Sequence, residues 1–122
     1  MKKLLIIAIA LLLSACQGTK VPFKPDVPPE GKALVYFYGY GDVTDGKIVI
    51  SLDGFSYVKY AFPVGPRYFW KKGLGGREKP VRLNLRAGEV FYLRGDDLNG
   101  SLRNAPIEIA QPVLTNLSER NI

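Results

Sequence analysis

The sequence contains no histidine and a single cysteine, Cys16, in 122 residues. Histidine is the commonest general base and metal ligand, so its absence argues against most hydrolases and zinc enzymes. Nucleophilic catalysis also needs a base beside the nucleophile, and no such activator is evident for the serines and threonines. A lone cysteine cannot form an internal disulfide. We therefore expect a protein that is not an enzyme, with no catalytic residues, no metal site and no cofactor.

Long hydrophobic runs are equally scarce, because only residues 4–13 form one. This run follows a short basic start and precedes two small residues, Ser14 and Ala15, which is the layout of a signal peptide. As a helix, a run of this length rises only about 15 Å against a hydrocarbon core of about 30 Å, so it is too short to span a bilayer. The sequence predicts a signal peptide over residues 1–15.

The end of this segment, Leu13-Ser14-Ala15-Cys16, resembles the bacterial lipobox. The resemblance implies cleavage between Ala15 and Cys16, a diacylglyceryl group on the Cys16 thiol and an acyl chain, such as palmitate, on its new amino group. Two lipid signals are enough for stable anchoring without a transmembrane helix. The alternative is an ordinary secretory signal with an incidental cysteine. In Gram-negative lipoproteins an aspartate after the cysteine is associated with inner-membrane retention, so Gln17 implies the periplasmic face of the outer membrane.

Proline is concentrated after the cysteine, with four prolines in residues 17–31. Proline-rich chain favours extended polyproline II at about 3.1 Å per residue, so this segment could hold a domain up to about 45 Å from a membrane. We expect residues 16–31 to form the lipidated N-terminus and a Pro-rich tether. The alternative is an arm that packs along the domain through Val21 and Phe23.

Short strand-like runs begin near residue 32. Residues 33–38 are apolar on both alternating faces, which predicts a central strand, and the glycines that follow are expected to end it. Asp53-Gly54 predicts a type I′ hairpin turn between two strands. The other predicted elements are strands over 48–52, 55–62, 68–72, 81–85, 89–94 and 102–110, the last interrupted by Pro106 at a sheet edge, and a short helix after residue 112.

The spacing of turn signals, about 8 to 12 residues, favours an all-β fold. We expect residues 32–122 to form a small antiparallel β-sandwich or barrel-like domain of about six or seven strands, with a short C-terminal helix. In residues 81–85 apolar and polar side chains alternate, so one face of that strand should be buried and the other should be wet and basic.

Several of these segments together resemble small bacterial lipoproteins that carry the domain of unknown function DUF2846. The segments are residues 28–38 (PPEGKALVYFY), Asp53-Gly54, residues 62–65 (FPVG) and residues 87–94 (AGEVFYLR). The resemblance covers about residues 28–110. It implies a β-rich lipoprotein domain with no catalytic residues to carry over. Val64 departs from the family pattern, in which a second proline is usual at this place.

Aromatic residues crowd the middle of the chain, where 13 of the 14 phenylalanine, tyrosine and tryptophan residues lie between positions 36 and 92. Aromatic and basic side chains are enriched at binding hot spots, so some of these residues could contact a glycan or a peptide. The alternative is that most belong to the core and to cross-strand pairs. Full burial of Trp70 and of two of the tyrosines would exclude the binding surface. Its candidate residues are Tyr40, Tyr57, Lys59, Tyr68, Trp70, Lys71, Lys72 and Arg77.

The excess of positive charge is small. The formal charge of +6 falls to +4 once residues 1–15, with their two lysines and no acidic residue, are removed. No dense Arg/Lys helix or nucleic-acid motif accompanies this charge. We therefore expect contact with a membrane through the lipid anchor and a partner that is an envelope protein or a cell-wall glycan, but no nucleic acid.

Together these features predict a membrane-anchored bacterial lipoprotein that serves as a non-enzymatic binding or structural module of the cell envelope. One alternative is an accessory lipoprotein subunit of an envelope or secretion machine. Another is a periplasmic enzyme inhibitor, although a basic inhibitor of the usual basic lysozyme would meet like-charge repulsion.

Overall fold

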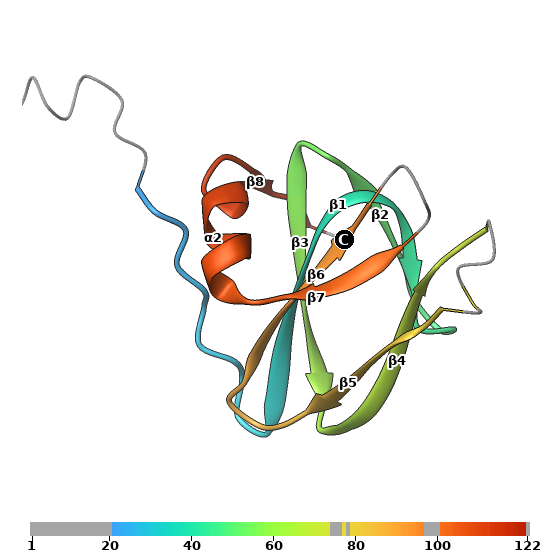
Figure 1. Cartoon of the computed structure of the whole chain (residues 1–122). Helices are drawn as coiled ribbons and strands as arrows, with labels where there is room; N and C mark the ends of the chain where they lie inside the picture. Colours follow the sequence, from blue (N-terminus) through green and yellow to red (C-terminus); the bar gives the residue numbers. More distant parts are fainter. Residues whose placement is uncertain (1–20, 74–76, 78, 97–100, 122) are drawn as a thin grey trace, which may run out of the picture.

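The computed structural model describes residues 21–73, 77, 79–96 and 101–121. The expected signal peptide and Cys16 lie outside the described residues. Within these residues the chain forms eight strands and one short helix, so the prediction of a small all-β domain is confirmed (Figure 1). The elements are β1 (Lys32–Thr44), β2 (Val49–Asp53), β3 (Ser56–Pro63), β4 (Gly65–Lys71), β5 (Val81–Leu85), β6 (Val90–Gly95), β7 (Leu102–Ala105), α2 (Ile107–Leu114) and β8 (Ser118–Glu119).

Strand β1 is the centre of the sheet, and its neighbours change along its length. The first half of β1 lies between β3, which is antiparallel to it, and β6, which is parallel. The second half lies between β2 and β4, both antiparallel. Strands β5, β7 and β8 extend the sheet beyond β4, β6 and β3. The sheet is therefore open and mixed. The expectation of a purely antiparallel arrangement is wrong for β6 and β8, which run parallel to β1 and β3. The sequence does not reveal strand direction, because side chains alternate between the two faces of a strand in parallel and antiparallel sheets alike.

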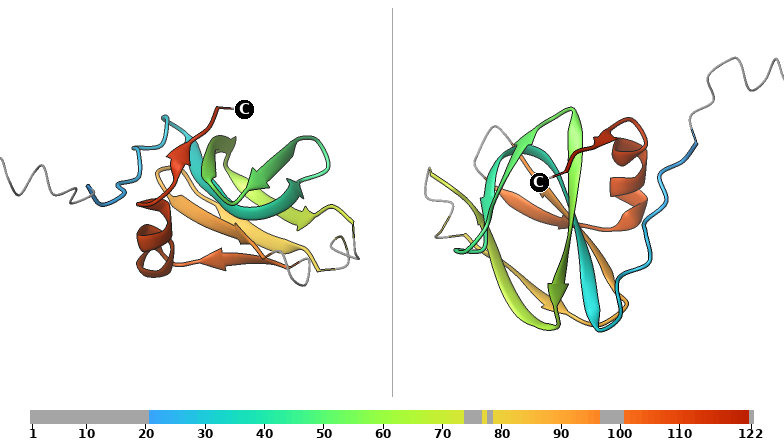
Figure 2. Two further views of the ribbon diagram at one scale, coloured as in Figure 1. Left: turned by 90° about the horizontal axis from the view of Figure 1, so that it is seen from above. Right: turned by 180° about the vertical axis from the view of Figure 1, so that it is seen from behind.

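Two hydrophobic cores lie on opposite faces of the first half of β1. Val35 and Phe37 enter the larger core, which lies between this part of the sheet and strands β2, β4 and β5. Tyr36 and Tyr38 enter the smaller core, which α2 and Phe23 cover. Helix α2 and the chain before β1 accordingly lie on one side of the central strands, and β4 and β5 on the other (Figures 1 and 2). The predicted burial of both faces of this strand is confirmed.

The glycines after residue 38 bend β1 and do not end it, so the expected break is wrong. Gly39 pairs with Gly95 on β6, at the point where β1 leaves β3 and β6. A Cβ atom on Gly39 would overlap the carbonyl oxygen of Gly95, and one on Gly95 would overlap the carbonyl oxygen of Tyr40. Glycine at these two positions therefore lets the backbones of β1 and β6 approach closely while β1 changes direction.

The predicted hairpin at Asp53-Gly54 is also wrong. Strands β2 and β3 both run antiparallel to β1, one opposite its second half and the other opposite its first half. The chain therefore continues in one direction along β1 from β2 into β3. Gly54 and Phe55 interrupt this long extended segment in the manner of a bulge. The reversal between β1 and β2 occurs earlier, at Asp45-Gly46. Both Asp-Gly pairs satisfy the same local turn chemistry, and only the pairing with β1 distinguishes them.

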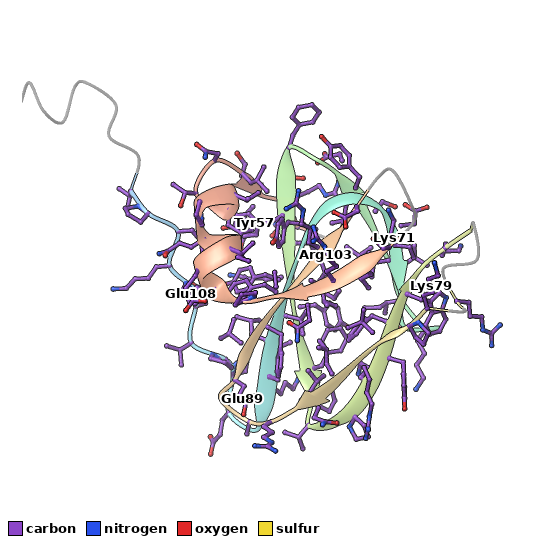
Figure 3. The ribbon with its side chains drawn as sticks, viewed as in Figure 1. Tyr57, Lys71, Lys79, Glu89, Arg103 and Glu108 are labelled. Atoms are coloured by element: carbon purple, nitrogen blue, oxygen red, sulfur yellow. The ribbon has the colours of Figure 1, made fainter. Side chains whose placement is uncertain are left out.

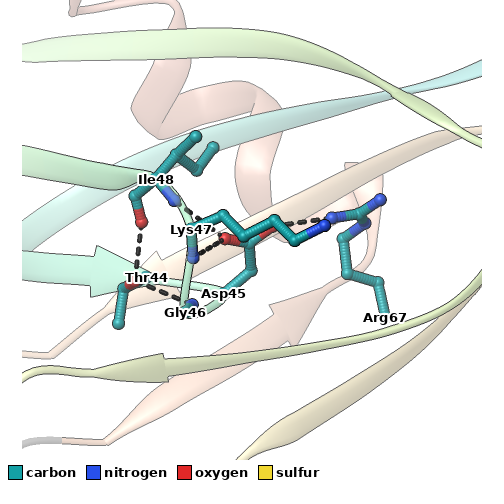
Figure 4. A network of polar contacts seen from close by, with 6 residues as sticks. All are labelled: Thr44, Asp45, Gly46, Lys47, Ile48 and Arg67. Carbon is teal, nitrogen blue, oxygen red and sulfur yellow. Dashed lines mark hydrogen bonds and ion pairs between the residues drawn. The ribbon is translucent and has the colours of Figure 1, made fainter.

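The turn between β1 and β2 is stabilised by the buried carboxylate of Asp45 (Figure 4). Asp45 Oδ1 accepts hydrogen bonds from the amides of Lys47 and Ile48 at 2.9 and 3.0 Å. Asp45 Oδ2 lies 2.7 Å from Nη1 of Arg67 on β4, and the Asp45 side chain is only 3% exposed. Burial alone would raise the pKa of Asp45, but the two amides and the Arg67 guanidinium outweigh it and hold the pKa below its usual value.

The C-terminal part of the chain differs from the prediction at Pro106. The strand predicted over 102–110 ends at Ala105, and the helix predicted after residue 112 begins earlier, at Ile107. Proline suits the start of a helix because its fixed φ is compatible with the first turn and its missing N–H is not needed there. The Pro106 carbonyl accepts hydrogen bonds from Ile109 and Ala110, which closes that first turn. Strand β8 was not expected.

Replacing Gly39 with alanine tests the close approach of β1 and β6. Because the new Cβ would meet backbone and the φ of Gly39 is +100°, we expect Gly39→Ala to lower the free energy of unfolding by more than about 3 kcal/mol. The matched control is Gly88→Ala, with a φ of +84° and nothing near the Cβ, which should cost only about 1 kcal/mol. Urea unfolding measures both, and equal losses would contradict this interpretation.

Replacing Asp45 with asparagine tests the buried ion pair. Because the folded pKa of Asp45 is lowered, its stabilisation is complete above the unfolded value of about 3.9 and is lost as the pH falls through the folded pKa. We expect Asp45→Asn to cost about 1 to 2 kcal/mol at pH 7 and much less near pH 2. Asp53→Asn, which changes the same motif at an exposed site, should cost less at pH 7. Chemical unfolding at both pH values measures this difference, and a pH-independent cost would argue against it.

Candidate functional site

Phe23, in the chain before β1, packs into the smaller core. Its side chain is 8% exposed. Its ring meets those of Tyr36, Tyr57 and Tyr92 edge to face, at centroid distances of 5.0, 5.5 and 6.2 Å. Edge-to-face aromatic pairs stabilise the folded protein beyond the stabilisation that burial of the rings provides. This part of the chain is therefore an arm fixed to the domain.

Hydrogen bonds hold the backbone of this arm to α2 and β1. The Phe23 amide donates to Thr115 Oγ1, and the Phe23 carbonyl accepts from Gln111 Nε2, both at 2.9 Å. Three residues later, the Asp26 amide donates to the Tyr36 hydroxyl at 2.9 Å. The alternative of a packed arm thus describes Phe23 and Asp26. Val21, in contrast, is 86% exposed.

Lys59 on β3 joins the arm to the C-terminal segment. Its ammonium forms ion pairs with the carboxylates of Asp26 in the arm and Glu119 in β8. Hydrogen bonds from Lys59 to these two carboxylates raise its pKa above the usual lysine value. All three side chains are partly exposed, so solvent weakens each pair. Lys59 therefore links the arm to β8 in the folded domain, and its ammonium is already engaged by two carboxylates.

The residues of the predicted binding surface do not form one surface. Tyr57 and Lys59 lie on the α2 side, whereas Tyr68 and Trp70 lie on the outer face of β4. Figure 3 shows Tyr57 beside α2 and Lys71 well away from it, toward β4. The burial test does not exclude a binding role, because Tyr68 is 50% exposed, Tyr40 is 45% exposed and Trp70 is partly exposed. Their positions on different sides of the sheet nevertheless divide the set into separate groups.

Three of the predicted residues, Trp70, Arg77 and Lys71, have specific contacts of their own. The Arg77 guanidinium lies 5.8 Å from the Trp70 ring centroid, in a cation–π arrangement. Lys71 is 7% exposed, and its ammonium donates to the backbone carbonyl of Asp96. Lys71 thus fixes the end of β6 from the inside and is not available as a surface contact. Lys72 is exposed.

A pocket at the bend in the middle of β1, beside the end of β6, was not predicted. Its volume is about 250 Å³. Among its lining residues Tyr38 is fully buried, and the Tyr38 hydroxyl has no hydrogen-bond partner within the described residues. We call this the β1–β6 pocket, and its lining residues are Tyr38, Gly39, Tyr40, Gly54, Arg94, Gly95, Asp96, Val113 and Leu117.

Strand register places two arginines beside Tyr38. Tyr38 pairs with Arg94 on β6, and Arg94 pairs with Arg103 on β7, so the three residues form one cross-strand row. Asp96 lies between the two guanidinium groups, with Oδ1 at 3.5 Å from Arg94 Nε and Oδ2 at 3.0 Å from Arg103 Nε. Asp96 Oδ2 also accepts a hydrogen bond from Ser101 Oγ at 3.1 Å. A single carboxylate thus balances two guanidinium groups.

The pKa of the Tyr38 hydroxyl reflects this setting. Burial raises the pKa of the Tyr38 hydroxyl. The positive charges of Arg94 and Arg103 lower this pKa in part, and the negative charge of Asp96 raises it further. The hydroxyl therefore stays protonated at neutral pH and can donate a hydrogen bond. The Tyr92 hydroxyl is likewise buried without a partner in the described part of the chain, and burial raises its pKa to about 12. Tyr92 does not line the β1–β6 pocket.

Sequence reasoning missed this pocket for an identifiable reason. The sequence places Tyr38 in a strand with two apolar faces and Arg94 at the end of the strand predicted over 89–94, and neither pattern indicates a pocket. The available signal was that Arg94 lies two residues after Tyr92, so both side chains must share a face of β6. An arginine on the same face as a buried aromatic indicates a polar site at the rim of a core.

Comparisons with protein-family models, with curated proteins and with solved structures found no significant match to this chain. The resemblance to DUF2846 lipoproteins stays a prediction. Among the described residues, no cluster of three or more acidic, cysteine or histidine side chains could hold a metal ion.

Replacing Phe23 with alanine tests the packed arm. Because the ring fills a site among three tyrosines, we expect Phe23→Ala to lower the free energy of unfolding by about 3 kcal/mol and to make residues 21–27 accessible to protease. The control is Val21→Ala, at an exposed position, which should change stability by less than about 0.5 kcal/mol. Limited proteolysis and thermal unfolding measure these effects. An arm that is cleaved equally fast in the unchanged protein would show that Phe23 is not a fixed contact.

Proposed function

We propose that this protein is a lipid-anchored module of the bacterial cell envelope, which binds a partner or ligand and does not transform it. The observation that carries the proposal is the lipobox-like tetrad at residues 13–16, after a basic start and a short apolar run. Cys16 would carry the diacylglyceryl and acyl groups, and Gln17 favours the periplasmic face of the outer membrane as the location.

The packed arm supports a short distance between the anchor and the domain. Phe23 lies seven positions after Cys16, and an extended chain covers at most about 3.6 Å per residue, so the domain surface at Phe23 would lie within about 25 Å of the anchor. This is roughly half of the reach of a fully free tether. The hydrogen bonds of Phe23 to α2 would also direct the α2 side of the domain toward the membrane.

The proposal of a binding module without catalysis comes from the residue types in the chain. The sequence has no histidine, and its only thiol would be lipidated. The β1–β6 pocket is lined by one guanidinium group, one carboxylate and apolar side chains, which are recognition groups, but it has no paired nucleophile and base among its lining residues. In the described part of the chain, no helix is long and apolar enough to cross a membrane.

Replacing Cys16 with alanine tests the anchor. In a Gram-negative host we expect Cys16→Ala to abolish incorporation of labelled palmitate and to move the protein out of the membrane fraction, since two lipid signals are needed for stable anchoring. Labelling of whole cells followed by fractionation measures both effects. A labelled, membrane-bound Cys16→Ala protein would refute the proposal.

The matched control is Gln17→Asp. This variant should keep the palmitate label, because Cys16 is unchanged, but should shift from the outer to the inner membrane on a density gradient. An unchanged position would remove the argument for the outer membrane and would leave the argument for lipidation intact.

A further inference from the structure

We propose that the outer face of β4 and β5 binds a cell-wall glycan that carries carboxylate groups. A sugar ring would stack on Tyr68, and the guanidinium groups of Arg82 and Arg77 would bind a carboxylate beside it. The proposal names a partner for the proposed binding module, and it rests on the proposed lipid anchor only for the location that brings the two together.

Strand register places an exposed aromatic ring beside an exposed guanidinium. Tyr68 on β4 lies directly opposite Arg82 on β5, so their Cβ atoms are about 5 Å apart on one face of the sheet. The next pair on this face is Pro66 and Asn84, which are also exposed. The other face of the two strands is buried, with Phe69 in the larger core. We call the solvent-facing strip of Pro66, Tyr68, Arg82 and Asn84 the β4–β5 face.

The Tyr68 ring is available to a ligand. Tyr68 is 50% exposed, and its side chain makes no ring contact or hydrogen bond with any residue that the structure describes. A sugar has an apolar C–H face that packs on a flat aromatic ring, and its hydroxyl groups need hydrogen-bonding neighbours. The Tyr68 hydroxyl, Asn84 and Arg82 supply such neighbours around the ring.

Trp70 holds a second guanidinium close to this face. Trp70 follows Tyr68 by two residues on β4, so its side chain emerges on the same face. A Cβ atom on Gly46 would lie 3.3 Å from the Trp70 ring, so the turn between β1 and β2 supports this ring. The Arg77 guanidinium lies 5.8 Å from the ring centroid. Because an arginine over an aromatic ring keeps the N–H donors at its edge, Arg77 can still bind a carboxylate.

The charge of this region favours an anionic ligand. Residues 77–86 (REKPVRLNLR) contain four basic residues and one acidic residue, Glu78. Arg82 forms no ion pair with a carboxylate in the described part of the chain. Strand register places Asp42 on the same side of the sheet, but Asp42 lies next to Lys72, whose amide donates to the Asp42 carbonyl. The positive charge of this region therefore exceeds the negative charge and attracts a carboxylate.

A glycan fits the β4–β5 face better than a protein partner does. The core of a protein interface is apolar and depleted in charge, and a stable one buries about 800 Å² on each side. The side chains around Tyr68 on this face are instead a proline, an amide and a guanidinium. One apolar ring among hydrogen-bonding groups suits a sugar, which is itself apolar on one face and polar at its edge.

The β4–β5 face also lies on the appropriate side of the domain. The arm and α2 lie on one side of the central strands, and β4 and β5 lie on the other (Figures 1 and 2). Because the arm would bring the lipid of Cys16 to the α2 side, the β4–β5 face would point away from the membrane. In the proposed location this direction is toward the cell wall.

Co-sedimentation with purified Gram-negative sacculi, the insoluble cell-wall polymer, tests the proposal. We expect the full chain, purified in detergent, to bind sacculi saturably and more weakly as the salt concentration rises. Sacculi whose carboxylates have been converted to amides should bind at least about fivefold more weakly. Polyglutamate, an acidic chain without sugar rings, should not release the bound protein at an equal concentration of carboxylate. Absence of binding at low salt, equal binding to amidated sacculi, or full release by polyglutamate would overturn the proposal.

Two variants locate the site. Tyr68→Ala and Arg82→Gln should each weaken binding to sacculi by about fivefold or more, because they remove the stacking ring and the charged donor. Both side chains are exposed, so the melting temperature should change little. The matched controls are Phe55→Ala, an exposed ring outside the face, and Lys24→Gln, an exposed cation in the arm. Both controls should bind as the unchanged chain does. Unaltered binding in Tyr68→Ala, or an equal loss in Lys24→Gln, would refute the site.

A Cys16→Ala chain separates this proposal from that of the lipid anchor. It should bind sacculi as the unchanged chain does, since the substitution leaves every residue of the β4–β5 face in place. Binding by a chain that carries no palmitate in cells would contradict only the anchor. A lipidated chain that does not bind sacculi would contradict only the site.

Discussion

The fold depends on one strand that is buried on both faces and changes partners halfway along. β1 supplies Val35 and Phe37 to the core beneath β4 and β5, and it supplies Tyr36 and Tyr38 to the core beneath α2. A single extended segment therefore holds two cores together. The change of partners takes place where Gly39 meets Gly95, and side chains larger than hydrogen would not fit there. The bend of the sheet and the pocket beside the bend both follow from this crossing.

The side of the sheet that α2 covers combines the features that matter for the proposed function. Phe23 brings the N-terminal arm to this side, Lys59 joins the arm to the C-terminal segment, and the β1–β6 pocket borders Val113 at the end of α2. If Cys16 is the anchor, the pocket and the attachment point belong to the same side of the domain. The opposite side, with Tyr68 on β4, offers exposed aromatic surface.

Local sequence signals identified the strands well and their connections poorly. The strand over 81–85 is confirmed, with Leu83 and Leu85 buried and Arg82 and Asn84 exposed, because alternation depends only on one buried face. Asp45-Gly46 and Asp53-Gly54 carry the same turn chemistry, but one reverses the chain and the other does not. Which of the two Asp-Gly pairs reverses the chain depends on how far β1 extends, because β2 and β3 pair with different halves of β1. Such pairing joins residues that are distant in the sequence. Proline before residue 107 was read as an interruption of a strand, although proline also starts helices.

The sequence by itself determined the all-β class and the two-faced character of residues 33–38, because each follows from composition or side-chain period. The tertiary structure alone decided the parallel pairing of β6, the packing of Phe23 and the row of Tyr38, Arg94 and Arg103. These features bring together residues far apart in the chain. Their positions result from strand register and core packing, for which no local pattern in the chain provides a signal.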